Sequence, residues 1–366
     1  MNFDFSDEQR FLQRTARDYL NENAPLGLCR LVLESDGGYS DDLWKGVAEM
    51  GWLGTAIPEE YGGSGFGHLE LVLIAEEVGY ALAPIPFSSS VYMATEALLL
   101  AGSAEQQERA LPKLAKGEII ATLALLERPG RVSANHFHAT FRDGRLNGRK
   151  VAVPDGHFAD FAVVAAKDGN GTSLVWVDLN HTGVTRYPVE SVDPSRPQSV
   201  LEFANVPAEP LGEAGSGWAL VERILDRAAV LMTFEQIGGA ERALEITREF
   251  CLGRYAFGRS IASFQAIKHR LADVYVAIEL ARSNAYYAAW ALSTDASELA
   301  VATCGARAAA SDAFELASQE MIQFHGGVGF TWEYDCHLFY RRAKTLGVVL
   351  GGADEWREKL MRRLGG

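Results

Sequence analysis

The residues best suited to chemistry lie in one segment, RYAFGRSIASFQAIKHRLAD, which runs from Arg254 to Asp273. It follows one helical pattern and opens another, with a glycine-containing break between them, so Arg254, Arg259 and Lys268 are predicted to lie near two helix ends. Unpaired N–H groups at a helix N-terminus attract anions, and guanidinium groups bind phosphate through paired hydrogen bonds. Arg259 together with Phe257 suits a ligand that carries a flat ring and a phosphate. The same spacing also fits a helical corner whose arginines are merely solvated.

The elements that must position this segment predict an α+β protein of three domains. Residues 1–118 show helical periodicity, with Ser6 capping the first helix, and form an N-terminal α-helical domain. Residues 119–212 contain short β-rich runs, and Asp143-Gly144 and Asn147-Gly148 are both hairpin signals, which predicts a middle antiparallel β domain. Residues 213–366 return to long helices with more than one apolar stripe, which indicates a C-terminal bundle that also packs against another subunit.

Charge and composition exclude several classes of function. The chain has 366 residues, 48% of them hydrophobic, and a net charge of −14, which argues against nucleic acid or an anionic membrane as a partner. Its four cysteines are scattered, and none is paired with histidine at a ligand-like spacing, so we expect reduced thiols and no metal site. The N-terminus lacks a signal-peptide pattern and no apolar run reaches membrane-spanning length, so a cytoplasmic location is expected.

Several motifs occur in one register along the chain. They are Met50-Gly-Trp-Leu-Gly, Pro58-Glu-Glu-Tyr-Gly-Gly, Leu111-Pro-Lys-Leu-Ala-Lys-Gly, Arg254-x-x-Phe-Gly-Arg, Gln323-Phe-His-Gly-Gly-Val-Gly and Arg341-Arg-Ala-Lys. Taken together, over nearly its whole length, the sequence resembles the acyl-CoA dehydrogenase family. The resemblance implies that family's fold, in which a helical domain, a β domain and a C-terminal four-helix bundle follow one another.

The resemblance also implies FAD, held between two subunits of a homo- or heterotetramer (a dimer of dimers). Arg254 and Gln265 correspond to residues that hold the adenosine diphosphate half, with Phe257 beside them. From the neighbouring chain, Gln323, Gly326 and Gly327 would do the same. Glycine has no Cβ, so its backbone N–H can approach a phosphate or adenine closely, although the glycine pair also fits a simple helix C-cap.

The chemistry implied is α,β-desaturation of an acyl-CoA thioester, with an electron-transferring flavoprotein or similar protein as acceptor. A buried glutamate must remove the α-proton. The two positions at which the family carries this glutamate are occupied by Leu350 and Ala228. Glu235 lies seven residues beyond Ala228, on the same predicted helix face, and is the candidate base; alternatively, it pairs with an arginine inside the bundle.

The flavin-contacting segments depart from the family pattern too. The Trp-x-Thr-Asn pattern is replaced by Ala152-Val-Pro-Asp, and Thr-Glu-Pro by Leu126-Glu-Arg-Pro. Pro154 offers neither an N–H nor a hydroxyl to a flavin. Three functions therefore stay open: an acyl-CoA dehydrogenase, a same-fold flavoprotein with other CoA-thioester chemistry such as desulfination or hydroxylation, and a partner subunit that completes the FAD site of a bacterial α2β2 enzyme.

Overall fold

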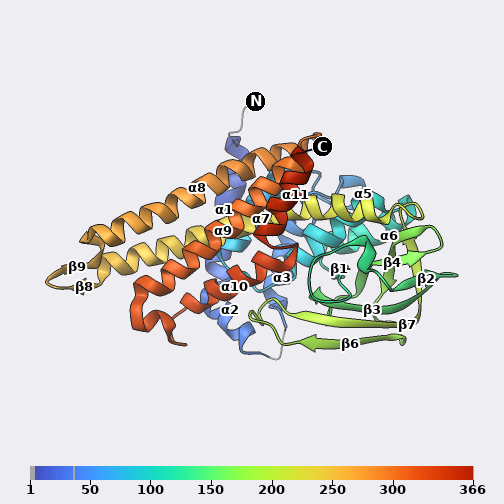
Figure 1. Ribbon diagram of the computed structural model, residues 1–366, viewed down its shortest axis with the longest axis horizontal. Coiled ribbons are helices and arrows are strands. Elements are labelled where there is room, and N and C mark those ends of the chain that lie inside the picture. The colour runs from blue at the N-terminus through green and yellow to red at the C-terminus, as the bar shows by residue number, and fades with distance from the viewer. Residues whose placement is uncertain (1–4, 36–37, 366) are drawn as a thin grey trace. The chain divides into compact units, whose positions relative to one another are not determined.

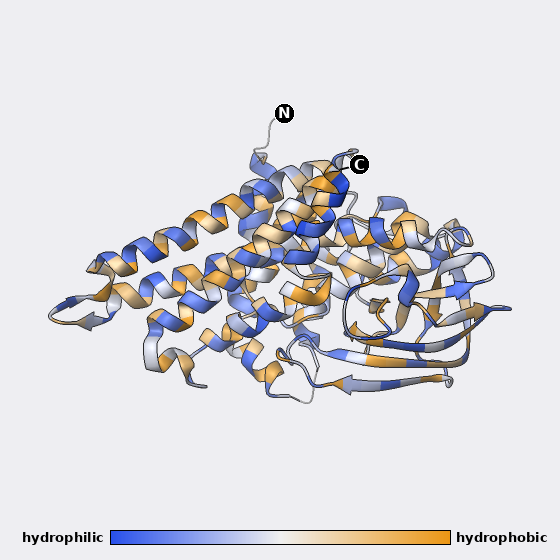
Figure 2. Ribbon diagram, in the orientation of Figure 1, coloured by the Kyte–Doolittle hydropathy of each residue, from blue (hydrophilic) through white to orange (hydrophobic). Residues whose placement is uncertain are grey.

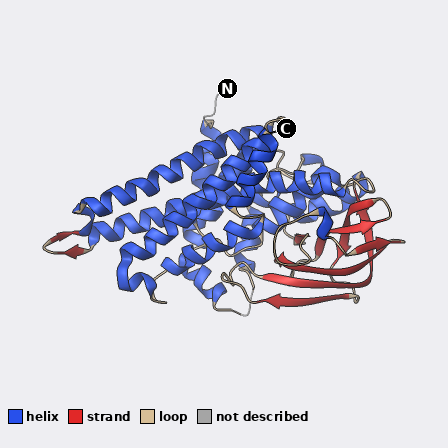
Figure 3. Cartoon of the chain, viewed as in Figure 1, coloured by secondary structure: helices blue, strands red, loops and turns tan. Residues whose placement is uncertain are grey.

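The computed structural model describes residues 5–35 and 38–365. Helices come first, strands next and long helices last, which confirms the predicted α+β class (Figure 1, Figure 3). None of the helices in these described ranges is both long and apolar enough to cross a membrane. The division into domains 1–118, 119–212 and 213–366 stays a prediction.

The first N-terminal helix begins where the sequence places a cap. The Ser6 hydroxyl oxygen accepts a hydrogen bond from the Gln9 N–H, and the Ser6 N–H donates to Gln9 Oε1, so a capping box starts the first helix as predicted. The helices are α1 (Asp7–Asn23), α2 (Leu26–Leu33), α3 (Asp41–Glu49), α4 (His68–Tyr80), α5 (Glu96–Ala101) and α6 (Ala104–Ala115), and a π-helix (Ser88–Thr95) precedes α5.

The strands form one mixed sheet. They are β1 (Ala121–Ala124), β2 (Thr140–Arg142), β3 (Arg145–Pro154), β4 (Phe161–Asp168), β5 (Gly171–Asp178), β6 (Val184–Val189) and β7 (Gln198–Leu211). Their order is β1-β4-β2-β3-β7-β5, and because β5 also pairs with β4 the sheet closes on itself, with β6 added beside β7. Most pairings are antiparallel as expected, but β4 runs parallel to both β1 and β2.

The two hairpin signals behave differently. Asp143 and Gly144 both have positive φ, 50° and 71°, and form the tight turn between β2 and β3. Asn147-Gly148 lies inside β3, so the prediction of a turn there is wrong. Gly148 instead sits at a register shift, and a Cβ on it would lie 2.6 Å from the Cβ of Ala139, so close packing requires this glycine.

The C-terminal helices are longer. They are α7 (Gly217–Gly253), α8 (Gln265–Ser293), α9 (Leu299–His325), α10 (Cys336–Val349) and α11 (Ala353–Leu364). A two-stranded hairpin, β8 (Tyr255–Ala256) and β9 (Arg259–Ser260), connects α7 to α8 and extends beyond their ends (Figure 1). Hydrophilic and hydrophobic residues alternate closely along α8 (Figure 2), and Tyr275, Val276 and Leu280 are exposed on it.

The chain divides into two compact units. The bundle unit contains Met1–Leu31, Leu69–Ala83 and Ala229–Gly366, and the sheet unit contains Val32–His68 and Pro84–Ala228. In the bundle unit α4 crosses α7 with the two main chains in contact. A Cβ on Gly238 would lie 1.8 Å from the carbonyl oxygen of Glu76, and one on Gly79 would lie 1.9 Å from that of Glu235. These glycines therefore fix the position of α7 against α4.

Candidate functional site

The predicted anion-binding corner is a projecting hairpin at the junction of α7 and α8. Phe257 and Gly258 form its turn, with φ values of 53° and 77°. A bulky residue at positive φ is strained, and Phe257 is also 95% exposed. The fold thus holds an aromatic side chain in solvent, at a cost in free energy, beside the cationic residues of the same segment.

The donors of this corner face outward from a well-ordered backbone. The Arg254 N–H donates to Phe250 O, and Arg254 O accepts from the Ile261 N–H, so the main chain of Arg254 is fixed while its side chain is exposed. The Arg259 guanidinium lies 4.0 Å from the centroid of the Phe264 ring. Gln265 opens α8, and no side chain caps that helix N-terminus. Exposed guanidinium groups, an exposed amide and uncapped N–H groups therefore gather in one place.

The second predicted group lies at the end of α9. Gln323 is exposed, and Gly326 ends the helix with φ 61° and ψ −138°, a conformation that favours glycine strongly. A Cβ on Gly326 or Gly327 would meet nothing within 4 Å. Gly326 is thus a helix C-cap, as the simpler interpretation holds, and its backbone is also open to a ligand.

The structure brings the two groups to the same end of the bundle unit. The rings of Phe250 and His325 stack with centroids 4.0 Å apart. Phe250 lies one turn before Arg254, and His325 directly precedes Gly326. Burial lowers the pKa of His325, which favours the neutral ring in this stack.

Glu235, the candidate base, is fully buried on α7. Its neighbour is Arg307 of α9, which is also fully buried and interacts electrostatically with Glu235. Burial lowers the pKa of Arg307 to about 9, and Glu235 opposes that shift. Arg307 donates to Gln236 Oε1 and to the carbonyl of Leu346 on α10. An arginine inside the bundle, the alternative left open by the sequence, is therefore present.

Ala228 and Leu350, at the two positions where a glutamate was sought, are both buried. Ala228 lies within α7, and Leu350 is the C-cap residue of α10. Neither side chain can accept a proton.

In the sheet unit, the segment Leu126-Glu-Arg-Pro takes part in an ion pair that the sequence did not indicate. Lys150 of β3 is fully buried, with Nζ 2.7 Å from Glu127 Oε1 and 3.0 Å from Leu125 O. Burial lowers the pKa of Lys150 to about 8, against the opposing effect of Glu127. Glu127 also accepts the N–H groups of His138 and Ala139. The Glu127 carboxylate is therefore engaged in contacts within the sheet unit.

The neighbouring Ala152-Val-Pro-Asp segment is irregular. Ala152 has φ 50° and lies at a register shift between β3 and β7. The carbonyl of Pro154 accepts a hydrogen bond of 2.6 Å from the Thr122 hydroxyl. A bulge in β3 thus re-aims the side chains on either side of it.

The chain matches models of known protein families at both ends. The model for the N-terminal domain of acyl-CoA dehydrogenase matches residues 6–118, and the model for the C-terminal domain matches residues 215–365. Acyl-CoA dehydrogenase IpdE2 of Mycobacterium tuberculosis is 35% identical over 361 residues, which cover 98% of this chain and 96% of IpdE2. The chain belongs to the acyl-CoA dehydrogenase family. It is a flavoprotein of the oxidoreductase class, as the motif register predicted.

Solved structures of the family match throughout. A variant of the Tcur3481-Tcur3483 steroid ACAD is 31% identical with a TM-score of 0.90, and covers 98% of each chain. A chain of the ChsE4-ChsE5 complex from Mycobacterium tuberculosis is 27% identical with a TM-score of 0.91, over 100% of this chain and 99% of the other. Both matches confirm the fold of a helical domain, a β domain and a C-terminal helical domain.

Proposed function

We propose that this acyl-CoA dehydrogenase-family chain uses FAD to desaturate an acyl-CoA thioester between Cα and Cβ. The observation that supports this proposal best is the corner formed by the hairpin and the uncapped start of α8. Arg254 would pair with the pyrophosphate of FAD, Gln265 would bind the adenosine half, and Phe257 would pack on it. The donor set fits the group, because it combines guanidinium, amide and open N–H groups with an exposed ring.

A second chain would complete this site. Gln323, Gly326 and Gly327 lie at the end of α9 with open backbone, and they would reach the FAD of a neighbouring subunit. Phe330 is 89% exposed directly after these glycines, and Tyr255 is 69% exposed in the hairpin. Large exposed aromatic side chains are typical of subunit interfaces. The proposed assembly is a homo- or heterotetramer, with an electron-transferring flavoprotein or similar protein as electron acceptor.

When bound, FAD supplies the redox chemistry by accepting the hydrogen from Cβ. The chain itself must remove the proton from Cα, and Glu235 is the candidate base. Because Glu235 is fully buried, it can act only on an acyl group that enters the bundle. Arg307 beside it would balance its charge while the substrate is absent.

A second candidate is that the chain is a partner subunit of a heteromeric dehydrogenase. Two observations favour it: Ala228 and Leu350 are buried apolar residues, and Glu235 already has a cationic neighbour. Two similar solved structures, the Tcur3481-Tcur3483 steroid ACAD and the ChsE4-ChsE5 complex, each join two differently named chains. In this case the base comes from a sister chain, and this chain contributes one end of a shared FAD.

Purification of the chain alone, and after co-expression with candidate sister chains, separates these functions. A yellow protein that is bleached by an acyl-CoA without a sister chain supports the first proposal. Flavin and bleaching that both require a sister chain support the second. A protein that binds no flavin under either condition contradicts both.

Two variants test the residues. Arg254→Ala should weaken the binding free energy of FAD by ~1.5–3 kcal/mol, the typical value of a charge-assisted contact, and so reduce flavin retention. Arg248→Ala, at an exposed position of α7, serves as control. Glu235→Gln should leave flavin content unchanged and abolish bleaching, with the exposed Glu315→Gln as control. Unchanged bleaching in Glu235→Gln would remove Glu235 from the mechanism, and where bleaching also requires a sister chain, that chain would be the source of the base.

A further inference from the structure

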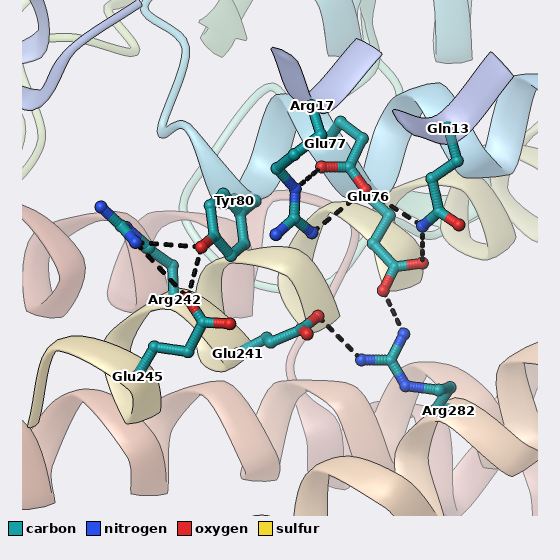
Figure 4. A network of polar contacts seen from close by, with 9 residues as sticks. All are labelled: Gln13, Arg17, Glu76, Glu77, Tyr80, Glu241, Arg242, Glu245 and Arg282. Atoms are coloured by element: carbon teal, nitrogen blue, oxygen red, sulfur yellow. Dashed lines mark hydrogen bonds and ion pairs between the residues drawn. The ribbon is translucent and has the colours of Figure 1, made fainter. Parts of the chain in front are cut away.

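Nine polar residues form one connected network in the bundle unit, which we name the clasp (Figure 4). It joins four helices, because its members come from α1 (Gln13, Arg17), α4 (Glu76, Glu77, Tyr80), α7 (Glu241, Arg242, Glu245) and α8 (Arg282). Sequence reasoning did not identify it, and it plays no part in the proposed site. Its charges and burial are unusual for a purely structural contact.

The part of the clasp at α1 is charge-balanced. Arg17 pairs with Glu77 through both Nε and Nη2, and its guanidinium lies 3.4 Å from the centroid of the Tyr80 ring. Gln13 Nε2 adds a hydrogen bond of 3.0 Å to Glu77 Oε1. The Glu77 side chain is only 1% exposed. One carboxylate and one guanidinium thus satisfy each other here.

The part at α8 is not balanced. Arg282 Nη1 donates to Glu76 Oε1, Nη2 lies 3.0 Å from Glu241 Oε2, and Nε lies 3.3 Å from Glu279 Oε1. The guanidinium of Arg282 therefore faces three carboxylates from three helices. Glu76 is 1% exposed, whereas Glu279 is 44% exposed and is screened by solvent. The phenol of Tyr286 faces Glu76 as well.

The remaining part, at α7, adds no surplus positive charge. Arg242 Nη1 lies 3.4 Å from Glu245 Oε2 and 2.9 Å from Tyr80 Oη, and the Tyr80 hydroxyl donates to Glu245. Both side chains of the Arg242–Glu245 pair are about one-third exposed. This pair is neutral by itself.

The clasp therefore contains four carboxylates (Glu76, Glu77, Glu241, Glu245) and three guanidinium groups (Arg17, Arg242, Arg282). A buried charge without a full counter-charge is costly, and a carboxyl group avoids that cost by holding a proton. We propose that the clasp holds one proton at weakly acidic pH, that the proton resides on Glu76, and that its loss as the pH rises through neutrality loosens the attachment of α1 and α8 to α4.

Glu76 is the site of the proton because of its pairing: Glu76 and Glu77 are both only 1% exposed, but Glu77 has two contacts with Arg17, whereas Glu76 shares Arg282 with Glu241 and Glu279. Burial raises the pKa of Glu76 to about 7 against the opposing effect of Arg282, and Glu77 and Glu241 raise it further. Its carbonyl oxygen lies against Gly238, where an added Cβ would come within 1.8 Å, so α4 and α7 are closely packed at this residue. The contacts that can respond are those to Arg282 and to Gln13, whose Nε2 lies 3.5 Å from Glu76 Oε2.

The sign of the effect follows from the raised pKa. The proton on Glu76 contributes stability that is fully present below pH 4.5, the ordinary pKa of the group, and that is lost as the pH rises through about 7. Between pH 6 and pH 8 this group alone should increase the unfolding equilibrium constant about tenfold. Above neutrality α1 and α8 should therefore exchange amide hydrogens faster.

The test compares full-length wild type with Glu76→Gln, both as purified, by urea unfolding at pH 6, 7 and 8. Gln cannot titrate, so the variant should lack the tenfold change, while Glu315→Gln, on an exposed pair with Lys344, should behave as wild type. Wild type and Glu76→Gln with the same pH dependence would overturn the proposal. Failure of the FAD proposal would leave this result unaffected, because the readout is stability.

Infrared spectroscopy gives a direct measurement that does not depend on unfolding. The wild-type protein should show the carbonyl band of a protonated buried carboxyl at pH 6 that weakens by pH 8 and is absent from Glu76→Gln. If Glu76→Gln does not fold, Glu241→Gln serves instead: it removes one neighbouring carboxylate and balances the clasp, so the band should be lost at a lower pH than in wild type. A band in Glu241→Gln with the same pH dependence as in wild type, or a wild-type protein without the band, contradicts the proposal.

Discussion

The crossing of α4 over α7 allows a quantitative prediction for Gly238→Ala. The added Cβ would lie 1.8 Å from Glu76 O and 2.8 Å from Tyr80 N, and both are main-chain atoms that cannot rotate away. The helices would have to separate by roughly 1 Å, and overpacking of this kind costs ~1–3 kcal/mol or more. A clash with two main-chain atoms should cost about 3 kcal/mol, the upper end of that range, and alanine regains about 1 kcal/mol of helix propensity over glycine, so the net loss in unfolding free energy should be roughly 2 kcal/mol.

Urea unfolding followed by circular dichroism measures this loss as a shift of the midpoint at unchanged slope. The matched control is Gly305→Ala in α9, where an added Cβ meets nothing within 4 Å. That variant should gain about 0.5–1 kcal/mol from helix propensity alone. A Gly238→Ala protein as stable as Gly305→Ala would refute the main-chain contact between α4 and α7.

Three further predictions concern the sheet unit and the hairpin. Burial opposes ionisation of Glu96, but His68 at 2.7 Å and Arg227 at 2.6 Å lower its pKa to about 2. Ionised Glu96 therefore contributes about 3 kcal/mol to the free energy of unfolding above pH 4.5, and this contribution is lost as the pH falls through 2. In urea unfolding, Glu96→Gln should lose less stability than wild type over that pH range. Lys150→Met should lower the free energy of unfolding by roughly 3 kcal/mol, because it leaves the buried Glu127 charge without its partner. The double variant with Glu127→Gln should recover part of that loss, since an amide needs no counter-charge. A double variant no more stable than Lys150→Met would contradict the ion pair. Phe257→Asn should stabilise the flavin-free chain by roughly 1 kcal/mol, since asparagine tolerates positive φ, yet reduce flavin content in a spectroscopic assay.

The fold class and the place of the candidate site could be predicted because they depend on local signals. Ser6 with Gln9 starts α1, and Asp143-Gly144 makes the β2–β3 turn. The break between α7 and α8 gathers Arg254, Phe257 and Gln265 because these residues are near one another in the chain. Caps, tight turns and short breaks are determined by a few adjacent residues, so the sequence alone was sufficient for them.

Tertiary structure decided which side chains meet across helices. For Glu235 the sequence left open whether an arginine of the bundle lies nearby, and the fold supplied Arg307 of α9, which interacts electrostatically with it. Asn147-Gly148 looked like a turn until Ala139 was packed against Gly148. The surplus of carboxylates around Glu76 arises only because the fold makes three carboxylates share Arg282, which lies more than two hundred residues after Glu76 in the chain. Burial and the balance of neighbouring charges depend on contacts between distant segments, and these two quantities decide what an ionisable group can do.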